Sequence, residues 1–97
     1  MPTFVVLGKL THKGLDQIKD VAQRDTKAEE IIKKAGGKTI ALYYTFGHYD
    51  FVAIVETPSE EAMAKILLEI GRFGNVSTQT LLAFTSEQLY KVTSTLK

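Results

Sequence analysis

The chain has 97 residues, which is enough for one domain with a hydrophobic core but too few for two. Its 12 Lys and Arg residues nearly balance 11 Asp and Glu residues, so the formal net charge is only +1. This balance argues against a nucleic-acid partner, because duplex binding needs a basic surface that contacts phosphates. There is no cysteine, which excludes disulfides, thiolate metal sites and thiol nucleophiles. We therefore expect residues 1–97 to form a single domain stabilised by packing.

The N-terminal segment MPTFVVLGKL has no basic stretch ahead of its short apolar run, so a secretory signal is not expected. No run approaches the roughly 18 apolar residues that a membrane-spanning helix needs. These features favour a soluble cytoplasmic protein without a membrane partner.

The first part of the chain predicts a strand followed by a helical region. Residues 3–10, TFVVLGKL, form a β-branched apolar run bounded by polar residues, which is typical of a strand. Across residues 11–37 apolar side chains recur at the three-and-four spacing of a helix face, and the pattern lapses at residues 24–26. Thr26 and Glu29 form a candidate capping box there, so we predict two helical pieces. The glycines at 36 and 37 should end the second piece, since glycine readily adopts the left-handed C-terminal conformation.

The central part predicts a β-hairpin. Residues 38–46, KTIALYYTF, and 50–56, DFVAIVE, are rich in β-branched and aromatic residues and are separated by a short turn segment. In the first of these strands we expect two sets of side chains on opposite faces: Ile40, Leu42, Tyr44 and Phe46 against Thr39, Ala41, Tyr43 and Thr45.

The last part predicts a helix, a strand and a short terminal helix. Thr57 as the cap, Pro58 at the first helical position and Glu60 mark the start of the helix. Residues 76–84, VSTQTLLAF, form the strand, and residues 85–96 form the terminal helix, with a second candidate capping box at its start. The buried face of the main helix is expected to comprise Ala62, Met63, Ile66, Leu67, Ile70 and Phe73.

The element order is β-α-β-β-α-β followed by a C-terminal helix. It predicts an α+β fold of the ferredoxin-like split βαβ type, with both main helices on one face of a four-stranded antiparallel sheet. Neither face of the central strands is plainly polar, and a large apolar face is seldom left in water. A second copy of the chain is the simplest cover, which predicts a homodimer through sheet faces and allows a higher oligomer. The alternative is that the terminal helix folds back over the sheet.

The segment GHYD, residues 47–50, is open to two interpretations. In the functional one His48 acts as a general acid or base, and Tyr49 and Asp50 orient it or a substrate. In the structural one Gly47 supplies a positive φ for the turn, Asp50 accepts turn amides and Tyr49 packs while its hydroxyl finds a partner. Successive residues in a turn point in different directions, so the structural interpretation is favoured.

Gly47, Tyr49 and Asp50 within TFGHYDFVAIVE, together with the opening strand into LTHKG and the later GNVSTQTLLAFT, resemble the GYD family of small prokaryotic proteins. The resemblance spans residues 3 to about 86 and makes these three residues family signature positions, with His48 in the variable one. It implies the dimeric α+β barrel superfamily, in which two ferredoxin-like sheets face each other across a twofold axis. It implies no established activity, because that superfamily includes cofactor-free monooxygenases, isomerases, haem-degrading enzymes and ligand-sensing regulatory domains.

Other candidate positions carry weaker signals. His12 and Lys13 lie at the expected start of the first helix, where amides can bind an anion, although a solvated helix entry is the commoner explanation. Thr78, Gln79 and Thr80 could line a polar patch or form cross-strand pairs. Two histidines without helical pairing do not suggest a metal site, and no phosphate loop or dinucleotide motif is present, so no cofactor is expected.

Three hypotheses for function follow. The first is a homodimeric module that binds a small apolar or aromatic ligand beside the sheet, near Tyr43, Tyr49 and the terminal helix. The second is a cofactor-free oxygenase or isomerase using His48 or Asp50, which requires these side chains to face an enclosed cavity. The third is a regulatory or structural dimer whose ligand is another protein.

Overall fold

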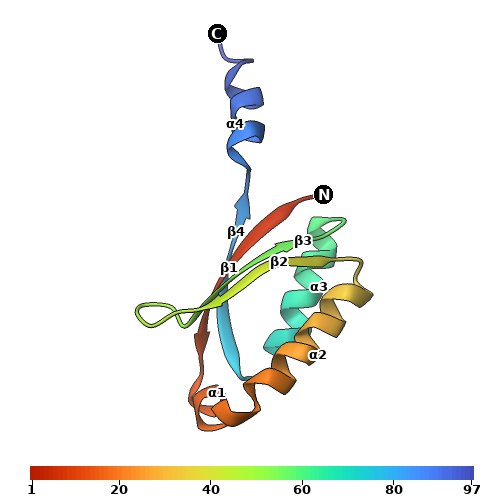
Figure 1. The fold of residues 1–97 in the computed structure, drawn as a ribbon. Helices are drawn as coiled ribbons and strands as arrows, with labels where there is room; N and C mark the ends of the chain where they lie inside the picture. The colour runs from red at the N-terminus through yellow and green to blue at the C-terminus, as the bar shows by residue number, and fades with distance from the viewer.

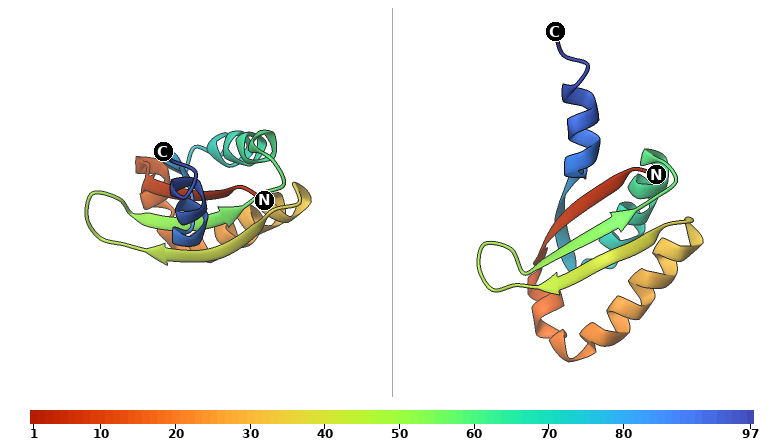
Figure 2. Two further views of the ribbon diagram at one scale, coloured as in Figure 1. Left: turned by 90° about the horizontal axis from the view of Figure 1, so that it is seen from above. Right: turned by 45° about the horizontal axis from the view of Figure 1, so that its top comes forward.

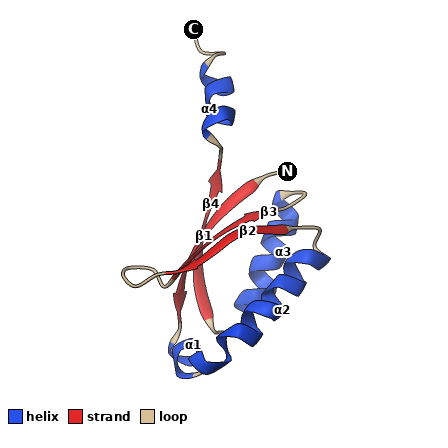
Figure 3. Ribbon diagram, viewed as in Figure 1, coloured by secondary structure: helices blue, strands red, loops and turns tan.

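The sheet is built around β1 (Thr3–Leu10), which lies between β3 (Phe51–Glu56) and β4 (Val76–Ala83), while β2 (Lys38–Tyr44) forms the edge beside β3. The computed structural model describes all 97 residues. Every neighbouring pair of strands is antiparallel (Figure 1; Figure 3). The chain therefore has the α+β, ferredoxin-like split βαβ fold that the element order predicts.

The first helical region is interrupted earlier than its sequence suggests. It consists of α1 (His12–Asp16), a 3-10 turn at Ile18–Asp20 and α2 (Val21–Lys34), so the interruption precedes α2 rather than falling within it. Thr26 lies inside α2, where its hydroxyl donates to the carbonyl of Ala22, one turn earlier, at 3.1 Å. The capping box predicted for Thr26 and Glu29 is therefore wrong.

The start of α3 (Glu60–Gly71) also differs from the prediction. The cap is Ser59, whose Oγ accepts a hydrogen bond from the Ala62 amide at 3.1 Å, and Pro58 precedes it. Thr57, the predicted cap, is instead fully buried, and its hydroxyl donates to the Ser59 carbonyl at 2.7 Å. The threonine thus holds the capping residue in place rather than capping the helix itself.

Both main helices lie along the same face of the sheet (Figure 1). Their contact with the sheet forms the hydrophobic core, which comprises Phe4, Val6, Ile32, Ala53, Val55, Met63 and Ile66. Gly36 ends α2 with a φ of +80°, as predicted, and returns the chain to β2.

The opposite face of the sheet has no helix over it, and we call it the open face. Its side chains alternate along each strand with those that enter the core, and apolar residues come from all four strands. The apolar members are Val5, Leu7, Ala41, Tyr43, Val52, Ile54, Leu81 and Ala83. The sheet is therefore apolar on both faces, as the sequence predicts.

A bulge near the start of β2 changes the predicted alternation. The pairing with β3 is irregular between Thr39 and Ala41, which leaves Ile40 as an extra residue. The Thr39 hydroxyl donates to the Glu29 carboxylate of α2 at 2.8 Å, so Thr39 faces the helices and not the open face. The strand also ends at Tyr44, two residues earlier than expected.

The C-terminal helix α4 (Ser86–Thr93) projects beyond the end of the sheet (Figure 2). Its predicted capping box is present: Thr85 Oγ1 accepts from the Gln88 amide at 3.1 Å, and Gln88 Oε1 accepts from the Thr85 amide at 2.8 Å. The alternative in which this helix folds back over the sheet is wrong, and the open face remains uncovered. None of the helices combines the length and the apolar character needed to cross a bilayer.

Candidate functional site

The hairpin loop between β2 and β3 is anchored at its base. The Thr45 amide donates to the Asp50 carbonyl at 2.8 Å, and the Asp50 amide donates to the Gly8 carbonyl at 2.7 Å. Asp50 Oδ2 accepts a hydrogen bond from the Leu10 amide at 2.8 Å. The carboxylate therefore ties the hairpin to β1 instead of accepting amides within the turn, which corrects the sequence-based interpretation.

The tip of the loop is free. His48 is exposed, and its ring is perpendicular to the Tyr49 ring with 5.1 Å between ring centroids. Gly47 does not have a positive φ, so the prediction that it supplies one for the turn is wrong. Neither His48 nor Asp50 lines the large cavity described below, and a catalytic role for either stays a prediction.

The two tyrosines predicted to bind ligand lie on the side of the open face. Tyr43 is 66% exposed. The Tyr49 hydroxyl donates to Gln79 Oε1 on β4 at 2.6 Å, and Lys9 Nζ lies 6.0 Å from the centroid of its ring. Tyr49 therefore connects the hairpin to the far edge strand, across β1. The structure places both tyrosines near the same surface, and their ligand-binding role stays a prediction.

The candidate polar patch on β4 is divided between the two faces. Thr78 and Thr80 pair with Gly8 and Val6, which face the helices, whereas Gln79 lies on the open face. The other candidate position is the start of α1. His12 is exposed there, and Lys13 Nζ donates to the Phe73 carbonyl at 2.8 Å.

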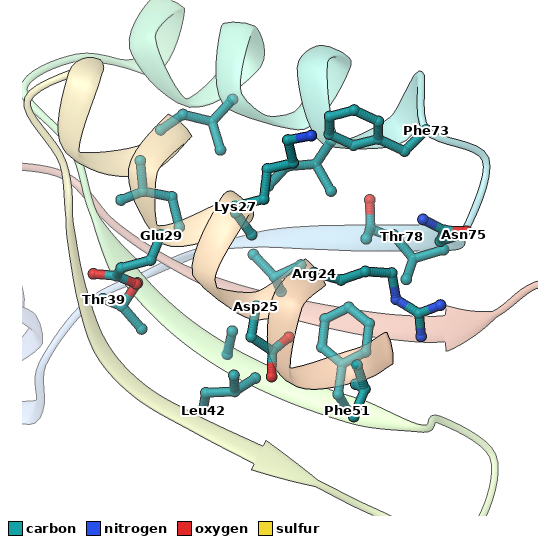
Figure 4. Close-up of a pocket in the computed structure, with 18 of the residues that line it drawn as sticks. Arg24, Asp25, Lys27, Glu29, Thr39, Leu42, Phe51, Phe73, Asn75 and Thr78 are labelled. Atoms are coloured by element: carbon teal, nitrogen blue, oxygen red, sulfur yellow. The ribbon is translucent and has the colours of Figure 1, made fainter. Parts of the chain in front are cut away.

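A cavity of about 580 Å³ lies between the sheet and the two main helices (Figure 4). It is on the helix side of the sheet, the face opposite to Tyr43. Its apolar wall includes Val6, Leu42, Phe51, Ile66, Leu67 and Ile70. Leu42 and Tyr44 line it from the edge strand β2 and are 40% and 44% exposed, so the cavity is open to solvent along that edge.

One end of this cavity is polar. Arg24 extends from α2, and its Nη1 donates to the carbonyls of Gly14 at 3.1 Å and Gln17 at 3.2 Å. Its Nη2 is buried and has no hydrogen-bond partner. Asn75, which precedes β4, also lines the cavity, and its Oδ1 is buried and unpartnered as well. Figure 4 shows both side chains at the same end of the cavity.

A second polar pair joins α2 to β2 at the cavity. The Tyr44 hydroxyl donates to the Asp25 carboxylate, with distances of 2.7 Å and 2.9 Å to its two oxygens. Partial burial, together with the adjacent Asp25 carboxylate, raises the pKa of Tyr44 well above its ordinary value. The phenol therefore remains a neutral donor at physiological pH.

The sequence contains a signal for this site, although the signal has two possible meanings. Arg24 and Asp25 lie where the apolar pattern of the helical region lapses, which predicts a break between helices. The helix instead continues through these positions, and their polar side chains line a cavity where apolar residues would otherwise fill the core. The sequence pattern alone does not distinguish a helix break from a helix over a cavity.

The fold and the open face together define a class of small split βαβ domains that present an apolar sheet surface. Within this class the chain belongs to the GYD-domain family, whose model matches residues 4–93. The family resemblance seen in the hairpin segment is thereby confirmed.

Known proteins similar to this chain include one of Thermus thermophilus, named glutamine synthetase and cystathionine beta-lyase binding protein. It is 34% identical over 82 residues, which cover 84% of this chain and 86% of that protein. A crystal structure of a Thermus thermophilus protein has a TM-score of 0.56 and 26% identity, covering 89% of this chain and 96% of the other.

A regulator from another organism shares the fold. The feast or famine regulatory protein of Mycobacterium tuberculosis, solved with L-methionine, has a TM-score of 0.65 and 20% identity. The match covers 89% of this chain and 52% of that regulator, so the chain spans about half its length.

Proposed function

We propose that the protein is a small homodimeric regulatory protein that pairs through the open face of its sheet and binds another protein. The observation that carries the proposal is the open face itself, where apolar side chains from four strands lie without cover. A monomer would leave this surface in water, whereas a second copy placed face to face would bury it on both chains at once.

Simple energetics supports self-association. Each 100 Å² of apolar surface removed from water contributes roughly 2.5 kcal/mol. Association costs roughly 4 to 15 kcal/mol in lost translation, rotation and side-chain freedom. Micromolar pairing corresponds to about 8 kcal/mol, so the contact must bury roughly 500 to 900 Å² of apolar surface over the two copies. Apolar side chains from four strands on each copy are suited to provide a contact of this kind.

A protein partner is supported by two separate facts. The 34% identical relative is named for binding glutamine synthetase and cystathionine beta-lyase. In addition, α4 extends away from the domain with Leu89, Tyr90 and Val92 exposed. An amphipathic helix with exposed apolar side chains is suited to docking in a groove of another protein.

The dimer is tested by light scattering on a dilution series with two variants. Leu81→Lys places a charge on the open face, whereas Leu68→Lys places one on the exposed surface of α3. We expect the unmodified protein and Leu68→Lys to keep the mass of two chains at micromolar concentration, and Leu81→Lys to give one folded chain. An unmodified protein that is folded and monomeric at this concentration would disprove the dimer.

The partner is tested by biolayer interferometry with purified glutamine synthetase and cystathionine beta-lyase. We expect at least one enzyme to bind the unmodified protein, and Leu89→Glu on α4 to weaken that binding at least tenfold without changing the dimer mass. Leu68→Glu is the matched control on α3 and should bind normally. Absence of binding to both enzymes would remove this choice of partner while leaving the dimer untouched.

The small ligand expected near Tyr43 and Tyr49 also belongs to this proposal. Because both side chains lie at the open face, a second copy would be needed to enclose a ligand there. A thermal shift caused by such a ligand should therefore vanish in Leu81→Lys. No contact in the structure favours catalysis by His48 or Asp50 over this binding role.

A further inference from the structure

The cavity on the helix side of the sheet is far larger than the voids of an ordinary core. Protein interiors pack nearly as densely as organic crystals and leave few voids larger than a water molecule. The cavity of about 580 Å³ falls instead in the range of small-molecule pockets, roughly 300 to 1,000 Å³. It is also open to solvent along β2, which supplies an entry path.

The chemistry of the polar end defines what this cavity would hold. Arg24 Nη1 donates to two backbone carbonyls, while Nη2 is buried without an acceptor. A buried cationic donor left unpaired is costly, and an anionic oxygen is its strongest partner. Asn75 Oδ1 at the same end lacks a donor, so Arg24 and Asn75 do not satisfy each other.

We propose that this cavity binds a small monocarboxylate with an aromatic or branched aliphatic body and a hydroxyl or amine next to the carboxylate. Both residues line the cavity, but Arg24 Nη2 and Asn75 Oδ1 are themselves enclosed, so binding requires the two side chains to turn toward the occupant. The carboxylate then accepts from the Arg24 guanidinium, the neighbouring group donates to Asn75 Oδ1, and the apolar body lies against residues of the apolar wall such as Phe51. One occupant thereby satisfies both unpartnered atoms and fills the apolar space.

The test uses three probes that differ in one group each. These are 3-phenyllactate, 3-phenylpropionate, which lacks the hydroxyl, and 3-phenylpropanamide, which lacks the charge. Binding is followed by titration of the ¹⁵N-labelled protein with two-dimensional NMR, which locates the site as well as the affinity. We expect 3-phenyllactate to bind most tightly, 3-phenylpropionate about fivefold more weakly, and the amide at least tenfold more weakly than 3-phenylpropionate, because a hydrogen bond to a charged group contributes more than a neutral one. The shifts should occur on α2, α3 and β3.

Variants assign the site to named residues. Arg24→Met should weaken 3-phenyllactate binding at least tenfold, whereas Arg72→Met, at an exposed arginine outside the cavity, should leave it unchanged. Ala28→Leu fills part of the cavity from α2 and should weaken binding while leaving the fold intact. If Arg24→Met does not fold, Ala28→Leu and the comparison of acid with amide decide the question.

Several outcomes would overturn the proposal. These are no binding of any probe at millimolar concentration, equal binding of acid and amide, unchanged binding in folded Arg24→Met, or shifts confined to the open face. The inference is independent of the proposed dimer because the cavity lies on the other side of the sheet. Leu81→Lys should therefore retain full 3-phenyllactate binding even as a monomer.

Discussion

The two faces of the sheet have similar apolar composition but contrasting surroundings. On the helix side, Phe4 and Val6 of β1 are buried beneath α2 and α3. On the open face, the neighbouring Val5 and Leu7 of the same strand are only partly buried. One strand thus contributes to the core with alternate residues and to an uncovered surface with the residues between them.

This contrast shows that hydrophobicity alone does not reveal which residues the fold of a single chain depends on. The helix side stabilises the chain itself, whereas the open face has no layer over it in the single chain and would be covered only in the proposed dimer. The helix side is also incompletely filled, because the cavity beside Arg24 occupies part of the layer. The two faces are therefore suited to different occupants, one to another protein surface and one to a small molecule.

The largest difference between the faces is expected from truncating one large side chain on each. Ile66 is 1% exposed, and Ile66→Ala should lower the free energy of unfolding by about 2 to 5 kcal/mol, because it removes buried contacts and leaves a cavity. Leu81 is 43% exposed, so Leu81→Ala should cost less. Urea unfolding at several protein concentrations checks both.

The concentration dependence sharpens this result. If a partner buries Leu81, the loss of unfolding free energy in Leu81→Ala should grow with the fraction of dimer. The loss in Ile66→Ala should not grow with that fraction. Equal losses for the two variants at every concentration would contradict the distinction between the faces.

The next effect concerns the hairpin, whose base is anchored while its tip is free. Asp50→Ala removes the acceptor of the Leu10 amide and should lower the free energy of unfolding by about 1 to 3 kcal/mol. His48→Ala, two residues away, should change it by less than about 0.5 kcal/mol because that side chain is exposed. Thermal unfolding of the two variants compares them directly, and an equal effect would refute the anchoring role of Asp50.

The sequence predicts the element order and the apolar character of both sheet faces because strand and helix periodicities are local properties. It predicts less well those features that depend on neighbours in space. Asp50 has the local pattern of a turn residue, but its acceptor role involves β1, which is 40 residues away. Simple alternation places Thr39 on the wrong face, because the bulge in β2 depends on pairing with β3.

The cavity illustrates the same limit. Its polar end brings together Arg24 of α2 and Asn75 before β4, two residues that no local pattern links. The sequence shows only that the apolar pattern lapses near Arg24. Whether such a lapse marks a helix break, a wet surface or a polar cavity wall is decided by how the helix packs on the sheet.

A further test on the helix side concerns pH. The pKa of Tyr44 is raised by partial burial and by Asp25, so the folded chain retains this proton to a higher pH than the unfolded chain does. The stability that Tyr44 contributes should therefore be fully present below the ordinary tyrosine pKa of about 10 and should fall as the pH rises above it. Urea unfolding at pH 9, 10 and 11 should show a steeper decline for the unmodified protein than for Tyr44→Phe. Parallel declines would show that the phenol is not perturbed.

The smallest effect is expected at Gly47, on the free tip of the hairpin. A valine there would cost about 1 to 3 kcal/mol if the backbone had a positive φ, because β-branched residues are strongly disfavoured in that region. Gly47 has no positive φ, and an added Cβ would meet no atom within 4 Å. Gly47→Val should therefore change the free energy of unfolding, measured by urea titration, by less than about 0.5 kcal/mol.

Gly36→Val is the matched control for this prediction. Gly36 has a φ of +80°, and a Cβ there would lie 3.0 Å from Pro58 Cγ, so a valine meets both backbone strain and a close contact. Gly36→Val should therefore lower the free energy of unfolding by about 1 to 3 kcal/mol in the same urea titration. A comparable loss in Gly47→Val would mean that the tip is constrained by contacts absent from the single chain, and the hairpin would then belong with the open face as a surface that depends on a partner.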